Sequence, residues 1–407
     1  MKKQIVLLIR NFNIGGPQKS LLALLDNIDY SKMDVTLYYV YGGGVLQSYV
    51  NKNVRLVQID PLIQHMLLEK GHIRKSFMYF VKHGHIGMAI YAIYLLARKI
   101  VTNNSMNMLR QRMIKRYSEK LRFDETIFDF GAGVSDCIMT YILVDCVNSR
   151  VKYHWVRSDY SIMDLDHKIE AHYFKKIDGA FAVSTQCGEI FCSYYPFMKG
   201  KVHEFINYIP FHYYESIESE AECLFPYPGK KIISICRIDP LKGLEIAVAA
   251  CRILIKRYNY TGFTWFVLGD GPSMGAVKDL IAKNNVADHF IMLGMKQNVF
   301  SILKECDLFV HPSRTEGRSN SVEEAKMCGL PIVLTRYETA VNQITDGVDG
   351  IICDIDGESL AKSIYELMNN PEKCLLFREN LRLRTSVEYN SISLIDDILA
   401  KPRYESK

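Results

Sequence analysis

The chain alternates along its length between short apolar runs and longer segments whose apolar residues recur three and four positions apart. The first pattern is typical of buried strands and the second of amphipathic helices. Strands are predicted at residues 4–9, 35–40, 54–58, 126–130, 152–156, 179–184, 202–206, 231–236, 264–268, 290–293, 307–310 and 331–335. Because helical segments separate most of these runs, the pattern predicts an α/β protein with parallel sheets.

Length and composition set the broad class. A chain of 407 residues is too long for one ordinary core, and residues 211–229 have the proline, glycine and acidic content of a linker. We predict domains at residues 1–210 and 230–385. Eleven scattered cysteines fit thiols in a reducing cytosol. The N-terminal apolar run is too short for a signal peptide, and no stretch is long enough for a spanning helix, so we predict a cytoplasmic protein.

The segment Lys70–Arg122 differs in charge from the rest of the chain. It holds twelve Lys and Arg against one acid, a net charge of +11, whereas the whole chain is +5 and the remainder therefore −6. Aromatic and aliphatic residues are interleaved with the basic ones. We predict a helical surface that docks on anionic lipid. The alternative is a pair of core helices with a solvated charged face. Nucleic acid is not predicted as a partner, because nothing else resembles a nucleic-acid module.

The stretch His311–Leu330 combines a strand end, a polar loop and a helix start. Ser319, Asn320 and Ser321 are good N-cap residues, and a glutamate that follows predicts a capping box. A helix N-terminus at the carboxyl end of a strand suits a phosphate. Two carboxylates, Glu316 in the loop and Glu324 in the helix, would lie nearby. The alternative interpretation is a capping glutamate and a solvated loop carboxylate.

Two further places suit phosphate binding. Arg237 and Lys242 stand five apart across a proline turn that opens a helix, so the two cations could clamp a diphosphate. Gly15 and Gly16 follow the first strand and precede a helix, where a backbone can approach a ligand closely. Surface charges at a helix start and an ordinary turn are the alternatives.

These motifs resemble the retaining glycosyltransferases of family 4. The Glu316-x7-Glu324 pair within PSRTEGRSNSVEEA resembles the family signature, and Arg237 with Lys242 matches its R-x-x-x-x-K-G pattern. The resemblance covers nearly the whole chain. It implies the GT-B fold, two Rossmann-like doubly wound domains facing across a cleft, with final helices at residues 386–407 that cross back to the first domain.

The resemblance also implies roles. Glu316 would hold the donor sugar, while Arg237 and Lys242 would stabilise the leaving diphosphate in place of a metal, so neither metal nor cofactor is predicted. Glu324 would bind the ribose. The predicted donor-binding residues are Gly15, Gly16, Gly269, Gly271, Lys296, Arg318, Ser319, Asn320, Ser321 and Glu324.

Two positions depart from the family pattern. Many members have W-x-H-x-D, with the histidine close to the transferred sugar, where this chain has Trp155-Val156-Arg157-Ser158-Asp159. We place Arg157 and Asp159 on the acceptor side, with His154 as a core residue. Arg318 stands where the family usually has an apolar or small residue, and would either read a charged sugar or face solvent.

The predicted function is transfer of a sugar, from a UDP-sugar before a GDP-sugar, to a lipid-linked saccharide in capsule, exopolysaccharide or O-antigen synthesis. The enzyme would lie on the inner face of a bacterial cell membrane. Two alternatives remain: another nucleotide-sugar enzyme such as an epimerase or a phosphorylase, and a non-catalytic GT-B partner subunit. Intact Arg237, Lys242, Glu316 and Glu324 argue against the partner subunit.

Overall fold

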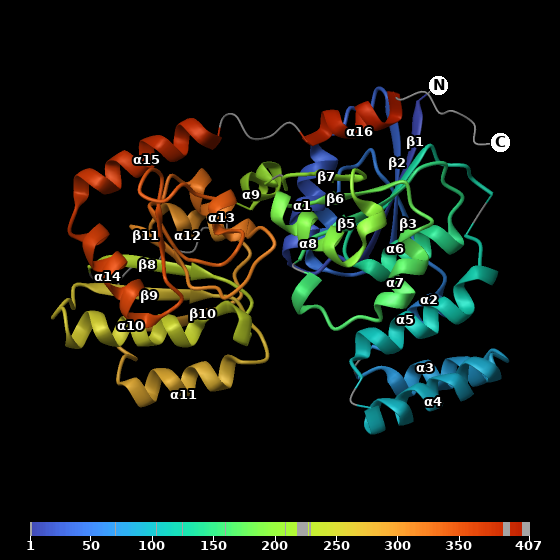
Figure 1. The fold of residues 1–407 in the computed structure, drawn as a ribbon, viewed down its shortest axis with the longest axis horizontal. Coiled ribbons are helices and arrows are strands. Elements are labelled where there is room, and N and C mark those ends of the chain that lie inside the picture. The colour runs from blue at the N-terminus through green and yellow to red at the C-terminus, as the bar shows by residue number, and fades with distance from the viewer. Residues whose placement is uncertain are drawn as a thin grey trace. The chain divides into compact units, whose positions relative to one another are not determined.

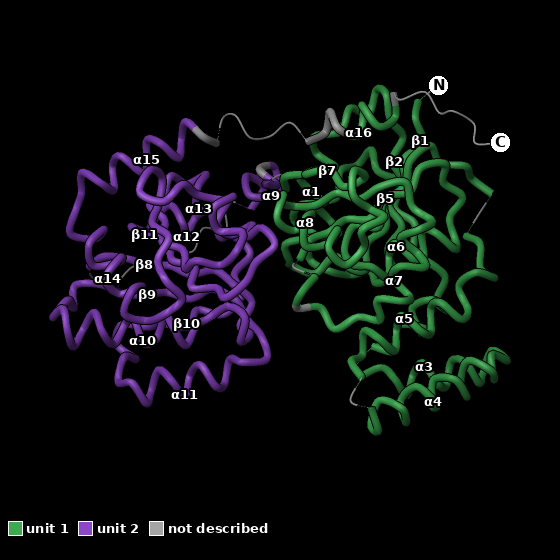
Figure 2. The backbone as a smooth tube through the Cα atoms, viewed as in Figure 1, with its two compact units in different colours: residues 1–208, 390–407 green, residues 209–389 purple. Residues whose placement is uncertain are grey.

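A computed structural model describes residues 2–69, 71–102, 104–123, 125–158, 160–207, 209–217, 227, 229–385 and 391–400. It divides the chain into two compact units (Figure 2). Unit 1 comprises residues 1–208 and 390–407, and unit 2 comprises residues 209–389. Asp159 and most of the predicted linker lie outside the described residues.

In the described part of unit 1, seven parallel strands form one sheet in the order β3-β2-β1-β4-β5-β6-β7 (Figure 1). The strands are β1 (Lys3–Asn11), β2 (Met33–Tyr41), β3 (Arg55–Gln58), β4 (Phe130–Gly133), β5 (Lys152–Val156), β6 (Gly179–Ala182) and β7 (Val202–Glu204). The helices are α1 (Gly16–Asp26), α2 (Pro61–Met66), α3 (Ile73–Lys82), α4 (Ile86–Thr102), α5 (Met106–Tyr117), α6 (Cys137–Cys146), α7 (His167–Phe174), α8 (Thr185–Tyr194) and α16 (Ser391–Ala400).

One predicted strand of unit 1 is displaced. Residues 126–130 were predicted to form it, but β4 begins at Phe130 and continues through Gly131 and Gly133. A Cβ on Gly133 would lie 2.5 Å from the backbone nitrogen of Thr140 in α6. Glycine therefore allows α6 to pack closely against the strand, a packing role that the sequence pattern does not distinguish from a turn.

In the described part of unit 2, six parallel strands form a second sheet in the order β10-β9-β8-β11-β12-β13. The strands are β8 (Lys230–Ile235), β9 (Phe263–Leu268), β10 (Phe290–Gly294), β11 (Leu308–His311), β12 (Ile332–Thr335) and β13 (Ile351–Cys353). The helices are α9 (Phe211–Ser216), α10 (Leu244–Lys256), α11 (Met274–Asn284), α12 (Val299–Lys304), α13 (Asn320–Met327), α14 (Gly357–Met368) and α15 (Pro371–Thr385). Two parallel α/β units of this kind agree with the predicted fold.

The core of unit 2 lies where its central strands meet the surrounding helices. Ile232, Trp265, Leu308 and Val333 come from four neighbouring strands and are fully buried. Because apolar runs fill the interior of the sheet, most polar side chains near the strands lie in the loops at the strand ends. In such sheets ligands bind at the carboxyl ends of the strands.

No helix within the described ranges is both long enough and apolar enough to cross a membrane. The cysteines that the structure describes are free thiols.

Candidate functional site

The loops that leave β8 and β11 meet at the carboxyl edge of the unit 2 sheet. Gly243, at the end of the first loop, has φ +63°, and a Cβ there would lie 2.0 Å from the carbonyl oxygen of Pro312 in the second loop. Only glycine combines that backbone conformation with that close approach. The contact brings Lys242 to Glu316, two predicted site residues that are 74 positions apart in the sequence.

One oxygen of Glu316 collects several donors. Lys242 Nζ and His311 Nε2 each lie 2.7 Å from Glu316 Oε1, and Ser313 Oγ lies 3.2 Å from it. Burial alone would raise the pKa of Glu316, but the hydrogen bond from His311 and the charge of Lys242 outweigh it and lower the pKa to about 2. Glu316 is therefore an ionised carboxylate at working pH, and His311 Nε2 carries the proton that it donates.

The backbone around Glu316 is held by hydroxyl groups from the end of β12 and from the region that follows it. Thr339 Oγ1 donates to the carbonyl oxygen of Glu316 at 2.9 Å, and Thr335 Oγ1 donates to the carbonyl oxygen of Ser313 at 2.5 Å. The carboxylate thus stands on a loop whose own carbonyl groups are fixed from the neighbouring strand. Such support preorganises a charged group.

Arg237 lies in the same region but has a different partner from Lys242. Its Nε and one terminal nitrogen both lie 2.6 Å from Asp239 Oδ2, while its side chain is 69% exposed. Asp239 is buried and also accepts a hydrogen bond from the backbone of Leu241 at 2.9 Å. The loop therefore holds one edge of the guanidinium and leaves most of the side chain open to a ligand.

Helix α13 begins at the predicted place, with Ser319 as its N-cap, but the predicted capping box is wrong. The Ser319 side chain makes no capping hydrogen bond and instead lies 3.0 Å from the hydroxyl of Ser321. The third residue of the helix, where a capping box has its glutamate, is Val322, and the carboxylate of Glu323 bonds to Arg318 and Lys326. The positive end of the helix dipole at this N-terminus can therefore still attract a phosphate.

Glu323 is the centre of a buried ion cluster under this helix. Its two oxygens lie 2.9 Å from Arg318 and 2.9 Å from Lys326, and Gln343 Nε2 donates to it at 3.0 Å. Burial opposes the charge, but Arg318 and Lys326 lower the pKa of Glu323. The Arg318 side chain is 2% exposed, so the solvent-facing alternative for it is wrong. Arg318 belongs to the support of the loop, and a direct contact with the donor stays a prediction.

Glu324, the neighbour of Glu323, points to another part of unit 2. It is 1% exposed, and its Oε1 accepts a hydrogen bond from the hydroxyl of Tyr214 in α9. Glu324, the predicted ribose-binding residue, is therefore a carboxylate that already accepts a hydrogen bond from the protein. Sequence reasoning missed Tyr214, which is separated from Glu324 by 110 positions.

The remaining predicted residues of unit 2 lie at the same edge of the sheet. Gly269 has φ +135°, and a Cβ there would lie 1.9 Å from the carbonyl oxygen of Cys236, so this glycine lets the loops after β8 and β9 touch. Gly271 approaches the carbonyl oxygen of Ile238 in the same way. Lys296 follows β10 and is half-buried. Contacts of these residues with a donor stay predictions.

In unit 1, Gly15 is the N-cap of α1 and Gly16 its first residue, so the helix begins within the glycine pair, earlier than the sequence pattern predicted. Arg157 follows β5. Its Nε donates to the carbonyl oxygen of Val134 at 2.6 Å, one terminal nitrogen donates to Asn207 at 3.2 Å, and its guanidinium lies 4.4 Å from the centre of the Trp155 ring. Burial lowers the pKa of Arg157 to about 9.

His154 is a core residue, as expected. It is 1% exposed and bonded to Thr140 and Tyr160. Burial and then the charge of Arg157 lower its pKa to about 3, so the imidazole is neutral.

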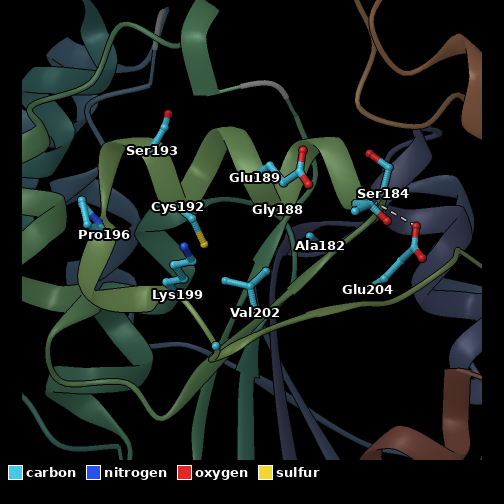
Figure 3. Close-up of a pocket in the computed structure, with 12 residues that line it drawn as sticks. Ala182, Ser184, Gly188, Glu189, Cys192, Ser193, Pro196, Lys199, Val202 and Glu204 are labelled. Carbon is cyan, nitrogen blue, oxygen red and sulfur yellow. Dashed lines mark hydrogen bonds between the residues drawn. The ribbon is translucent and has the colours of Figure 1, made fainter.

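A hollow of about 600 Å³ opens in unit 1 beside α8 and β7 (Figure 3). Ser184 and Glu204 stand at its end near the carboxyl edge of the sheet, and the Thr185 backbone donates to Glu204 at 3.1 Å. None of the predicted site residues lines it. Its walls are mostly small side chains, which leave no recognisable signal in the sequence.

The basic segment of unit 1 forms α3, α4 and α5, and Figure 1 shows α3 and α4 side by side beyond α5. Both helices expose apolar side chains: Phe77, Met78 and Val81 on α3, and Ile86, Ile90, Ile93, Tyr94, Ile100 and Val101 on α4. Arg74, Lys75, Lys82 and Arg98 are exposed on the same two helices. The structure thus differs from the alternative of core helices whose only exposed face is charged.

His311 is the site residue that the sequence could have revealed. It is a polar residue that ends a buried strand directly before the signature loop, the position from which a side chain reaches the carboxyl edge. Thr339 and Ser313 carry no comparable signal, because hydroxyl residues are common in loops.

Part of this chain is similar in sequence to known glycosyltransferases. Residues 217–384 match the family model described as "Glycosyl transferases group 1". An amylovoran biosynthesis glycosyltransferase of Erwinia amylovora is 27% identical over 169 residues, which are 39% of this chain and 41% of that protein. The N,N'-diacetylbacillosaminyl-diphospho-undecaprenol alpha-1,3-N-acetylgalactosaminyltransferase of Campylobacter jejuni is 33% identical over 164 residues, 39% of this chain and 38% of the relative. The chain thus spans about two fifths of the curated relatives it matches.

The fold likeness extends much further than the sequence likeness. The crystal structure of Anabaena HepE in complex with UDP covers 97% of this chain and 98% of its own at a TM-score of 0.67 and 13% identity. The predicted GT-B fold with two Rossmann-like units is therefore confirmed. Residues 217–384, which match the group 1 glycosyltransferase model, include the edge built from Lys242, Glu316 and α13.

Proposed function

We propose that this protein is a retaining glycosyltransferase of family 4 that moves a sugar from a nucleoside diphosphate to a saccharide acceptor. The observation that carries the proposal is the meeting of Lys242, an ionised Glu316 and the N-terminus of α13 at one edge of the unit 2 sheet. Cations and a helix N-terminus suit a diphosphate, and a fixed carboxylate suits a sugar that gains positive charge.

In this mechanism the leaving diphosphate is stabilised by Arg237, Lys242 and the first amide groups of α13. Lys242 keeps two of its three ammonium hydrogens for phosphate while one remains on Glu316. Arg237 offers the exposed edge of its guanidinium. As the bond to the sugar breaks, negative charge grows on the diphosphate, and these groups lower the energy of that state. No metal or cofactor is included in the proposal.

Glu316 acts on the sugar. Its Oε1 is held by Lys242 and His311, and its low pKa keeps it charged throughout the working range. A carboxylate fixed in this way holds sugar hydroxyl groups and stabilises an oxocarbenium-like ring. Departure of the diphosphate on the face where the acceptor enters lets a phosphate oxygen take the acceptor proton, which gives retention of configuration.

We propose a UDP-sugar as the donor and a polyprenyl-linked saccharide of a surface polysaccharide as the acceptor. HepE binds UDP in its crystal structure, and the relatives above are named for amylovoran biosynthesis and for a diphospho-undecaprenol acceptor. An acceptor of that kind is embedded in a bilayer. The enzyme would then work at the cytoplasmic face of the cell membrane.

The α3–α4 surface supports that location. Exposed apolar residues on two adjacent helices can enter the headgroup region while the neighbouring basic residues meet anionic lipid. Sedimentation with vesicles of phosphatidylglycerol and phosphatidylcholine should capture the protein, and vesicles of phosphatidylcholine alone should capture less. Replacing Ile90 and Ile93 by serine should weaken capture, while the control Leu383→Ser on α15, equally exposed, should not. Equal capture by both kinds of vesicle would contradict the proposal.

A thermal-shift titration in EDTA with UDP, GDP, ADP and CMP tests the donor site. A ligand at a hundred times its dissociation constant should add about 2.7 kcal/mol of stability. We expect a shift with one nucleoside diphosphate, UDP first, and a weaker shift in Glu324→Gln. A response that requires added metal would contradict the metal-free mechanism. No shift with any nucleotide would favour a non-catalytic subunit.

A further inference from the structure

Helix α9, the first element of unit 2, is attached to the part of the site predicted to bind the nucleoside. The hydroxyl of Tyr214 donates to Glu324 Oε1. The Tyr214 ring packs on Phe300 of α12, with ring centres 4.3 Å apart and an angle of 32° between planes. Asn298, at the start of α12, donates from Nδ2 to the carbonyl oxygen of Ile217 at 2.9 Å. These contacts fix the C-terminal half of the short helix.

The contact between Tyr214 and Glu324 is buried. Tyr214 is 4% exposed and Glu324 is 1% exposed. A carboxylate in such surroundings has no water to turn toward, so its direction is set by the group that donates to it. Burial and the nearby Glu324 carboxylate raise the pKa of Tyr214 well above its usual value, so its hydroxyl keeps its hydrogen and remains a donor at working pH.

The adjacent glutamates Glu323 and Glu324 are separated by these contacts. Glu323 is neutralised by Arg318 and Lys326 on its own side of α13, whereas Glu324 faces α9. Consecutive residues of a helix point about 100° apart, so one cannot replace the other. Of the two, Glu324 is the one bonded to α9, whose C-cap Ile217 is in turn held by Asn298 at the end of the loop after β10.

We propose that Tyr214 is a positioning residue for the donor nucleoside: it holds the carboxylate of Glu324 in the direction that receives the ribose hydroxyl groups. The inference rests on the proposed function, in which Glu324 binds the ribose. It adds α9 to the donor site, as a support that fixes the Glu324 carboxylate on one side and the end of the loop after β10, through Asn298, on the other.

The test compares UDP with 2′-deoxy-UDP by calorimetry on the full chain, or GDP with 2′-deoxy-GDP if the thermal-shift series selects guanine. A hydrogen bond to a charged group is worth roughly a factor of ten or more in affinity. We expect the wild type to prefer UDP by about that factor. Tyr214→Phe, which removes only the hydroxyl, should weaken UDP binding about tenfold and bring the ratio for the two nucleotides close to one.

Two further variants distinguish positioning from a general loss of structure. Tyr213→Phe removes a buried hydroxyl from the adjacent position of the same helix and should leave the ratio unchanged. In a Glu324→Gln background, Tyr214→Phe should add little, because both changes act through one carboxylate. A change in melting temperature with an unchanged ratio would show that Tyr214 is only structural, and would overturn the proposal.

Tighter UDP binding in Tyr214→Phe would overturn it in another way, by showing that the hydroxyl occupies the place of the ribose. A wild type that binds no nucleoside diphosphate would instead overturn the proposed function itself. The outcomes are therefore distinguishable.

Discussion

The two units share one architecture but treat buried charge differently at the carboxyl edges of their sheets. In unit 2, the cations near the edge have carboxylate partners: Lys242 pairs with Glu316, Arg237 with Asp239, and Arg318 and Lys326 with Glu323. In unit 1, the described partners of Arg157 are the carbonyl oxygen of Val134, the amide of Asn207 and the Trp155 ring, all of them neutral.

Other half-buried arginines of unit 1 do not share this property. Arg10 pairs with Asp136 at 3.1 Å, and Arg110 pairs with Glu69 at 2.9 Å. The unit can therefore supply carboxylates where a structural arginine needs them. The difference teaches that the edge of unit 2 is a network in which cations and carboxylates are paired, whereas the partners that the described residues provide for Arg157 are neutral. The match to the group 1 family model lies at residues 217–384, in unit 2.

The largest expected effect is at the centre of the unit 2 network. Glu323→Gln leaves Arg318 and Lys326 without their carboxylate in a site from which water is excluded, and should lower the free energy of unfolding of unit 2 by about 3 kcal/mol or more. Each unit contains one tryptophan, Trp155 or Trp265. Urea denaturation in a Trp155→Phe background therefore reports on unit 2 through Trp265.

The matched control for that experiment is Glu245→Gln. Glu245 pairs with Arg314 at 2.7 Å, but both side chains are at least 40% exposed. An exposed pair should cost less than about 1 kcal/mol. Similar losses in the two variants would show that the buried network is no more important to stability than a surface ion pair.

The second effect concerns ligand affinity. Lys242→Met removes the cation that we place between Glu316 and the diphosphate, and should weaken UDP binding 10- to 100-fold, the factor that corresponds to roughly 1.5–3 kcal/mol for a charged hydrogen bond. Calorimetry measures it directly. Lys362→Met, which changes an exposed lysine of α14, should bind UDP as the wild type does. Unchanged affinity in Lys242→Met would remove Lys242 from the donor site.

Most strand positions could be predicted from the sequence, because buried strands leave unbroken apolar runs, whereas the order of the strands within each sheet comes from the structure. Residues 152–156 were predicted as a strand and form β5. The strand at 126–130 was misplaced because Gly131 and Gly133 serve packing against α6. Periodicity records which face is buried and carries no information on how closely a neighbouring helix approaches.

The candidate site, too, could be predicted only in part from the sequence. Glu316, Lys242 and the start of α13 come from local motifs and were predicted as members of one site. Their mutual contacts, and the Tyr214–Glu324 contact across 110 positions, depend on which loops the fold brings together. The burial of Arg318 could not be predicted either, because an arginine in a polar loop gives no sign that it is buried.

A third effect tests how unit 1 treats a buried acid. The Glu170 side chain has 0% exposure and accepts a hydrogen bond from Tyr195, with His167 at 3.4 Å. Burial raises its pKa from 4.5 to about 7. The folded state therefore keeps a proton that the unfolded state loses, and the stability of unit 1 should fall as pH rises from about 4.5 through about 7.

Glu170→Gln does not titrate and keeps an acceptor for Tyr195. It should exceed the wild type in stability by on the order of 2 kcal/mol at pH 8 and by little at pH 4.5. Denaturation in a Trp265→Phe background, followed through Trp155, measures unit 1. Glu189→Gln, an exposed change on α8, should show no such pH dependence. A difference independent of pH would show that Glu170 is ionised in the fold.

The smallest expected effect decides the comparison between the two edges. Arg157→Met loses two hydrogen bonds and the contact with Trp155, but it also removes the cost of burying a charge whose partners among the described residues are neutral. These terms oppose each other, so the free energy of unfolding of unit 1 should change by less than about 1 kcal/mol. Arg110→Met, which leaves Glu69 short of a cation, should lower it by about 2 kcal/mol in the same Trp265→Phe background. A large loss in Arg157→Met would make Arg157 a structural residue like Arg110. A near-zero change would mean that the charge of Arg157 contributes little to the stability of unit 1, and its predicted place on the acceptor side would stand.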